Sequence, residues 1–408
     1  MSFELPSLDL SQEVAYVALL FGLFVVPRLL QRFRVPAAIT SIALGAIAGP
    51  GLGLFSDDAT LTLLATLGIV SLFLFAGLEV EVDKLRAQRR ILFEHLGLRL
   101  VGLLVCAVLA AVALDLEARA AALLALALLT PSTGFILDSL ASMGLAPNAL
   151  FWVRAKAIAT EIIALGVMFV VLQSTTIEGL ALSSAALATI IVVLPLLFRG
   201  FGRFVVPYAP KTEFAFLLMI AVVSAMITRK LGVYYLVGAF VVGIIAQRFR
   251  ERLPAIASER MLHAVESFAS IFVPFYFFHA GLVLQRSDFS RAALILGALF
   301  FALAVPARLG LIALHRRLRL QESLRESLRV GVPMLPTLVF TLVIAQALRE
   351  TFSVSPQIYG GLIIYALATT VVPSFVFRMP PPDFETPEAP PLHVEEPCNA
   401  TIDIEGRA

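Results

Sequence analysis

A single carboxylate lies deep inside an apolar stretch of this sequence. Glu161 follows Thr160 in the run FWVRAKAIATEIIALGVMFVVLQ, residues 151–173. An ionisable side chain in such a run is costly and marks an ion or proton pathway by default. Burial disfavours the charged form, so a cation and a proton would compete for the carboxylate. The sequence therefore predicts that Glu161 binds a monovalent cation or a proton, with a structural ion pair as the alternative.

Basic residues and a second acid lie at comparable depth. Arg308 interrupts the run LGALFFALAVPARLGLIAL, residues 296–314. A buried guanidinium needs a carboxylate or free carbonyls, so Glu161 or a broken helix end is its expected partner. Snorkelling of the side chain towards the cytoplasm is the alternative. Asp138 with Lys156, or with Arg154, is interpreted first as a structural or gating ion pair and second as an ion relay.

Neutral oxygens suited to a hard cation come from an interrupted helix. The apolar run 119–141 contains Thr130-Pro131-Ser132-Thr133-Gly134 near its middle. Proline removes a backbone donor, and lipid cannot satisfy the groups that are freed, so this break must be buried in protein or line a wet cavity. The run 328–349 is interrupted in the same way by Pro333 and Pro336. The hydroxyls predicted to help bind the ion belong to Thr130, Ser132, Thr133 and Thr160.

The composition indicates that these residues belong to helices of a membrane protein. Of 408 residues, 59% are hydrophobic and 15% charged, and the mean hydropathy is +0.93. We predict an all-α polytopic membrane protein with about 13 transmembrane helices. The expected spans are 13–30, 35–55, 59–79, 93–114, 119–141, 151–173, 178–198, 212–230, 232–249, 267–285, 291–314, 328–349 and 356–377. A short extracytoplasmic segment, 1–12, precedes them, and a proline-rich, acidic tail, 378–408, is expected to be disordered in the cytoplasm. Its closing IEGR resembles a protease site.

The loop charges predict the orientation. Arginines and lysines gather after the first, third, seventh, ninth and eleventh spans, whereas the alternate loops hold acids such as Asp57 and Asp58. By the positive-inside rule the N-terminus lies outside and the C-terminus in the cytoplasm, which requires an odd number of spans. The expected location is the inner (plasma) membrane.

The two breaks predict an internal symmetry. Each lies in the fifth span of a six-span half, 13–173 or 212–377, and the second break comes seven spans after the first. The halves must then run in opposite senses, with 178–198 as a linker. Paired interruptions in an inverted repeat are the best sequence pointer to a transport site.

Four further segments carry a family resemblance. They are VSLFLFAGLEVEVDKLR (70–86), LTPSTGFILDSL (129–140), YYLVGAFVVGII (234–245) and FVPFYFFHAGLVL (272–284). In this order and spacing they resemble the Kef-type and sodium/proton exchangers of the monovalent cation:proton antiporter-2 family. The resemblance covers residues 13–377.

This resemblance implies a thirteen-span fold, a homodimer formed by one set of spans, and a mobile core with two broken helices. It implies an ion-binding carboxylate at Glu161 and a charge-compensating base at Arg308. Thr160-Glu161 departs from the family's usual Asn-Asp, Asp-Asp or Gln-Asp pair, so ion selectivity does not transfer. Electroneutral relatives carry arginine in the eleventh span, where electrogenic ones carry lysine. One cation per proton is therefore expected.

The sequence favours an antiporter that exchanges Na⁺ or K⁺, or Li⁺, for H⁺ by alternating access, and not an enzyme. Its partners are these ions and the bilayer; no cofactor and no nucleic acid are expected. One alternative is a sodium-coupled organic-anion symporter, which would need further cation ligands. Another is a membrane sensor that has lost transport. An intramembrane enzyme is disfavoured because the zinc-protease pattern His-Glu-x-x-His is absent from the sequence.

Overall fold

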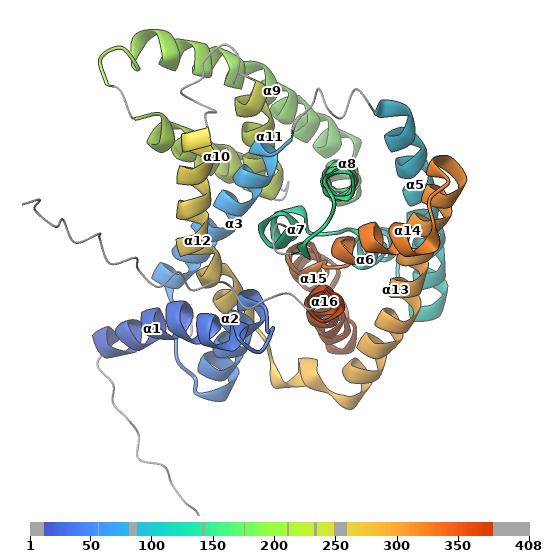
Figure 1. Ribbon diagram of the computed structural model, residues 1–408. Helices are drawn as coiled ribbons and strands as arrows, with labels where there is room; N and C mark the ends of the chain where they lie inside the picture. The colour runs from blue at the N-terminus through green and yellow to red at the C-terminus, as the bar shows by residue number, and fades with distance from the viewer. Residues whose placement is uncertain are drawn as a thin grey trace, which may run out of the picture.

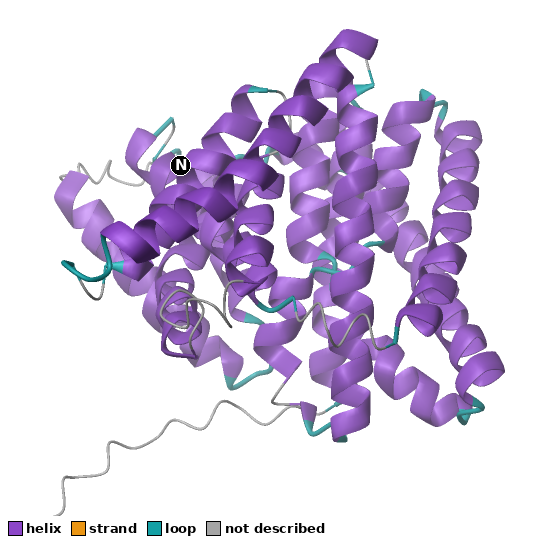
Figure 2. Ribbon diagram, turned by 90° about the horizontal axis from the view of Figure 1, so that it is seen from above, coloured by secondary structure: helices purple, strands orange, loops and turns teal. Residues whose placement is uncertain are grey.

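The computed structural model describes residues 12–55, 57–80, 88–140, 143–174, 176–209, 212–231, 235–248 and 259–377. Within these ranges all regular structure is helical, and short loops interrupt some of the long helices at mid-height (Figure 2). In lipid, helices satisfy their own backbone groups, which is why the apolar runs adopt this form. The all-α membrane fold predicted from the sequence is confirmed.

One set of helices forms the first bundle, seen on the left of Figure 1. Its centre is α3, against which α11 and α12 pack, and α12 also contacts α2. The members are α1 (Gln12–Gln31), α2 (Ala37–Ala46) with the π-helical turn η1 (Ile47–Gly51), α3 (Ala59–Leu78), α9 (Ile177–Phe204), α10 (Glu213–Lys230), α11 (Tyr235–Arg248) and α12 (Glu259–Leu282).

The remaining helices form a second group, which we call the crossing bundle (Figure 1). α6 packs against α5 and α15, and α16 packs against α13 and α15. The members are α5 (Arg89–Leu114), α6 (Ala118–Leu129), α7 (Thr133–Leu140), α8 (Pro147–Gln173), η3 (Arg286–Phe289), α13 (Arg291–Leu320), α14 (Leu324–Gly331), η4 (Val332–Met334), α15 (Leu338–Phe352) and α16 (Pro356–Val376).

The interrupted helix is the most enclosed part of the crossing bundle. In an apolar window of 18 residues within 118–137, 89% of the residues are buried. The corresponding windows of α5 and α9 are only 11% and 17% buried. The break therefore lies in protein and away from lipid, as the cost of unpaired backbone groups demands. Each of the thirteen predicted spans overlaps a helix or a broken pair of this structure.

Length and hydropathy decide which of these helices can cross a membrane. Among the described residues, nine helices are long and apolar enough to span a membrane, or ten if α14 and α15 count as one bent span. α2 with η1 and α11 are shorter apolar helices. The count of thirteen spans therefore stays a prediction, and so do the inverted repeat and the domain limits. The predicted tail, 378–408, and residues 1–11 lie outside the described residues.

Glycines allow the first bundle to pack closely. A Cβ added to Gly45 of α2 would lie 2.0 Å from the carbonyl oxygen of Phe278 in α12. We expect Gly45→Ala to cost about 1–3 kcal/mol, because two helix backbones would have to separate. Thermal unfolding of the purified protein should show a lower melting temperature. Gly97→Ala is the matched control, since nothing lies within 4 Å of its added Cβ. Equal melting temperatures for the two variants would contradict the close approach.

Candidate ion-binding site

The two interrupted helices meet at their breaks. α6 ends at Leu129, Thr130 is extended (φ −89°, ψ 123°), and α7 begins at Thr133. The pair formed by α14–η4 and α15 bends by 51° at its own break. The backbone N–H of Ser132 donates to the carbonyl of Pro336 at 2.9 Å. The sequence prediction of two broken, crossing helices is therefore confirmed.

Two further hydrogen bonds connect the two broken helices where they cross. The Ser132 hydroxyl oxygen accepts from the backbone N–H of Phe340 at 3.1 Å, in the first turn of α15. The Thr341 hydroxyl donates to the carbonyl of Ala127 at 2.7 Å, in the last turn of α6. Backbone groups freed by each break are thus satisfied by the other broken helix. Ser132 has a structural role here that the sequence did not indicate.

Glu161 lies at the first break. Its side chain is 2% exposed, and its Oε2 accepts from the backbone N–H of Thr133 at 3.2 Å. A carboxylate at this position faces the partial positive charge of the N-terminus of α7. The hydroxyl of Thr133 is buried beside this carboxylate. The hydroxyl of Thr160 donates to the Lys156 carbonyl at 2.7 Å, which leaves its lone pairs available.

Arg308 binds the second break and not Glu161. Its side chain is fully buried and donates to the carbonyls of Met334 at 2.5 Å and Leu335 at 2.9 Å, and to the hydroxyl of Tyr365 at 3.0 Å. These carbonyls end the helical turns before the break, where partial negative charge accumulates. The expected contact with free carbonyls is present. Within the described ranges no ion pair between Arg308 and Glu161 occurs, because the guanidinium is occupied at these carbonyls.

Lys156 is buried beside a histidine. Its Nζ lies 3.2 Å from Nδ1 of His315 in α13 and 5.8 Å from the ring centre of Trp152. Arg154, the alternative base, points elsewhere, with its Nη1 at 4.0 Å from a carboxylate oxygen of Glu79. Asp138 belongs to α7, but its side chain lies outside the described residues, so its ion pair with Lys156 stays a prediction.

Two residues of the crossing were not singled out from the sequence. The Tyr365 hydroxyl donates to the carbonyl of Leu128 at 2.6 Å while it accepts from Arg308, and so connects the end of α6 to α13. Arg99 of α5 donates through Nη1 to the carbonyl of Leu129 at 3.2 Å. The available signal was an arginine inside the fourth apolar run.

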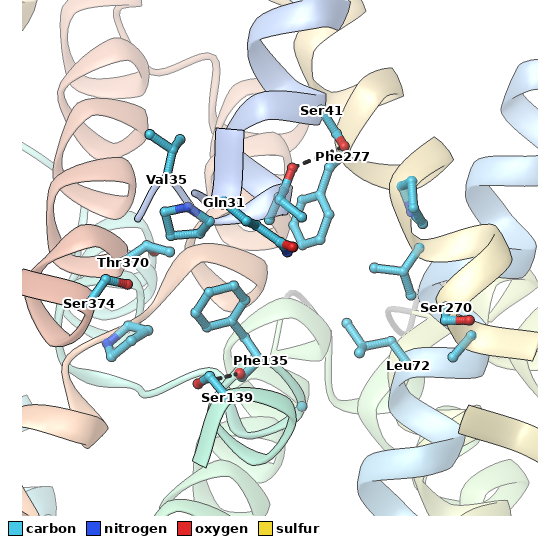
Figure 3. A pocket seen from close by; sticks show the side chains of 18 of the residues that line it. Gln31, Val35, Ser41, Leu72, Phe135, Ser139, Ser270, Phe277, Thr370 and Ser374 are labelled. Carbon is cyan, nitrogen blue, oxygen red and sulfur yellow. Dashed lines mark hydrogen bonds between the residues drawn. The ribbon is translucent and has the colours of Figure 1, made fainter. Parts of the chain in front are cut away.

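A cavity between the two bundles leads to the crossing (Figure 3). Its volume is about 540 Å³, and its walls come from α2, α3 and α12 on one side and from α7 and α16 on the other. Leu72, Phe135 and Thr370 project into this space. Gly134 and Pro336, one from each break, form part of its lining, whereas Glu161 does not. The cavity thus reaches the breaks but stops short of the carboxylate.

A second cavity lies towards the opposite ends of the same helices. It has about 360 Å³ and is lined by Thr62 and Thr66 of α3, His279 of α12 and Glu350 of α15. On α16 the first cavity reaches Thr370 to Ser374, whereas the second reaches Tyr359. Eleven or more residues of helix between these positions correspond to about 16 Å of rise. The two cavities therefore approach the crossing from opposite ends of the bundle.

Comparison with known proteins gives consistent matches. The family model of the sodium/hydrogen exchanger transmembrane region matches residues 17–380. A probable Na⁺/H⁺ antiporter 3 of Methanocaldococcus jannaschii is 24% identical over 372 residues, which cover 87% of this chain and 93% of that protein. The Na⁺/H⁺ antiporter NhaS5 of Synechocystis is 23% identical over 380 residues, which cover 88% of this chain and 53% of that longer protein.

The fold has a counterpart among solved structures. The sodium proton antiporter MjNhaP1 of Methanocaldococcus jannaschii at pH 8 superposes with a TM-score of 0.64 at 14% identity, over 90% of this chain and 95% of that one. This likeness supports the fold. The family model spans nearly all of the helical region, and the chain therefore belongs to the sodium/hydrogen exchanger transmembrane family.

Proposed function

We propose that this protein exchanges a monovalent cation for protons across the membrane, with Na⁺ as the first candidate. The observation that carries the proposal is Glu161, a buried carboxylate at the crossing of two broken helices with no basic partner among the described residues. Both relatives with curated names are Na⁺/H⁺ antiporters. These names favour Na⁺ over K⁺, and they favour the sodium/proton branch of the family over the Kef-type one.

Glu161 acts as the shared site for the two ions. The buried carboxylate is costly when it is charged and alone, so it binds either a proton or a cation. Thr133 and Thr160 lie beside it and offer hydroxyl oxygens of the kind that hard cations prefer. Thr130 and Ser132 are the further candidates. Because binding of one ion requires release of the other, competition for Glu161 couples the two fluxes.

The bundles supply the movement. The crossing bundle carries Glu161 and both breaks, while the first bundle supplies most of the facing walls of the cavities. A shift of one bundle against the other would open Glu161 first to one cavity and then to the other, as alternating access requires. Under the predicted orientation, the cavity of about 540 Å³ opens to the cytoplasm, because residues that follow the first span line it.

Further parts of the proposal rest on the sequence. Arg308 stands where electrogenic relatives carry a lysine, so one cation exchanges for one proton and transport is electroneutral. The protein works as a homodimer in the plasma membrane, with its N-terminus outside and its C-terminus in the cytoplasm. Asp138 and Lys156 keep the roles predicted from the sequence, first a structural or gating ion pair and second an ion relay.

The experiment is transport by the purified protein in liposomes. With an acid interior and a pH-sensitive dye inside, addition of Na⁺ outside should raise the internal pH within seconds. Li⁺ and K⁺ measure selectivity, and choline with empty liposomes gives the background. Clamping the membrane potential with valinomycin and K⁺ should leave the rate unchanged if exchange is one to one. The absence of a response to any cation, from folded protein, would show that the proposal is wrong.

A further inference from the structure

The two breaks are held by arginines in the same way. Arg99 lies on α5, the helix before the first broken pair, and binds the carbonyl of Leu129 at the end of α6. Arg308 lies on α13, the helix before the second broken pair, and binds the carbonyl of Leu335. Each guanidinium thus meets the carbonyl end of one half-helix, where about half a unit of negative charge is concentrated. Nothing in the sequence resemblance assigns a role to Arg99.

Arg99 is less well satisfied than Arg308. It is 5% exposed, and both its Nε and its Nη2 are buried without a hydrogen-bond partner in the described part of the protein. A guanidinium buried in this way is costly, so its retention in an apolar run calls for a specific role. The side chain lines a small cavity of about 10 Å³ together with Thr130 and Thr160. That space admits at most one water molecule.

Through this cavity Arg99 faces two of the candidate threonines of the ion site, Thr130 and Thr160. The Thr160 hydroxyl donates its hydrogen bond to the Lys156 carbonyl, so its oxygen can accept a hydrogen bond from Arg99. Thr160 directly precedes Glu161 on α8. We propose that Arg99 is a second charge-compensating residue of the transport site, which positions the end of α6 and sets the electrostatic potential at Glu161. This inference rests on the proposed exchange function.

Other charged and titratable groups surround Arg99, and their contribution must be separated from its own. Arg308 and Tyr365, which are hydrogen-bonded to each other, are both near enough to interact electrostatically with Arg99. Nearer the start of α5, His95 interacts with Lys156 of α8, with Arg99 itself, and with His315 and Arg316 of α13. Among the described residues, the titratable and charged groups in electrostatic contact with Arg99 are Arg308, Tyr365, Lys156 and His95, and His315 and Arg316 lie beside His95. In the described part of the chain, the groups of this set that bind the carbonyl ends of the broken helices are Arg99, Arg308 and Tyr365.

The test compares Arg99→Gln with Arg99→Lys in the liposome assay. Loss of the positive charge leaves the carbonyl end of α6 uncompensated, so Glu161 should hold both proton and cation more tightly. We expect the pH of half-maximal Na⁺/H⁺ exchange to rise by about one unit in Arg99→Gln. At the alkaline end of the profile the apparent KM for Na⁺ should fall. Arg99→Lys keeps the charge and should keep the wild-type profile.

Arg89→Gln is the matched control, because Arg89 begins the same helix and is exposed. A purely structural Arg99 would lower the melting temperature of Arg99→Gln and leave its pH profile and KM unchanged, and that result would overturn the inference. So would Arg99→Lys behaving like Arg99→Gln. If the wild-type protein exchanges no cation at all, the proposed function is wrong and this inference is wrong with it.

Discussion

Glu161→Gln should abolish cation-dependent proton transport, with a loss of about a hundredfold or more, equivalent to ~2.7 kcal/mol. Glutamine is neutral and nearly the same size, and its carbonyl oxygen can still accept from the Thr133 N–H that Glu161 now binds. The variant therefore resembles the protonated carboxyl and should be held in the proton-loaded form. It can neither release a proton nor attract a cation. The liposome assay with Na⁺ measures the loss.

Ligand-dependent stability separates lost binding from lost folding. A cation that binds only the folded protein raises its melting temperature. We expect Na⁺ to stabilise the wild-type protein at alkaline pH and to leave Glu161→Gln unaffected. The variant alone should be at least as stable as the wild type, since a buried, unpaired charge is removed. Glu178→Gln, an exposed carboxylate at the start of α9, is the control. Transport that survives in Glu161→Gln would move the site elsewhere, with Asp138 as the next candidate.

Much of the fold could be predicted because membrane helices obey simple rules. Apolar runs of about twenty residues fix where helices form. Proline with glycine at mid-span fixes where they break, and both breaks occur where the sequence indicated. The division into two bundles depends on which helices pack together. The sequence of one apolar run does not show which other helices pack against it. It was therefore available only through the family resemblance.

The site could be predicted only in part. A charged residue inside an apolar run is visible in the sequence, which identified Glu161 and Arg308. Its partner is not visible, because the partner is a backbone carbonyl, and every residue has one. Arg308 was for this reason linked to Glu161 as well as to the break, although it binds Met334 and Leu335. Tyr365 acts through a hydroxyl, which apolar helices commonly contain, so nothing in the sequence distinguished it. Ser132 was predicted as an ion ligand, and its hydrogen bond to Phe340 depends on a helix contact that the sequence does not show.

The second large effect is expected for Arg308→Met. Methionine fills a similar volume but leaves the carbonyls of Met334 and Leu335 without a donor at a site that is fully buried. Loss of one partner in a buried charged network costs about 3–5 kcal/mol. The end of η4 and the hydroxyl of Tyr365 should then lose their fixed positions. Exchange in liposomes should fall by about a hundredfold, and the melting temperature should fall with it.

Arg308→Lys distinguishes the charge of this residue from its geometry. Lysine restores the positive charge, but its single nitrogen cannot reproduce the planar fork that binds two carbonyls and Tyr365 at once. An intermediate loss, about tenfold, is expected if both matter. Full activity would show that charge alone suffices, and a loss as large as in Arg308→Met would show that geometry dominates. Arg317→Met, exposed on the same helix, should behave as wild type. Wild-type exchange by Arg308→Met would contradict the role of Arg308. The second broken helix would then keep its position without the guanidinium that binds its carbonyls in the described structure.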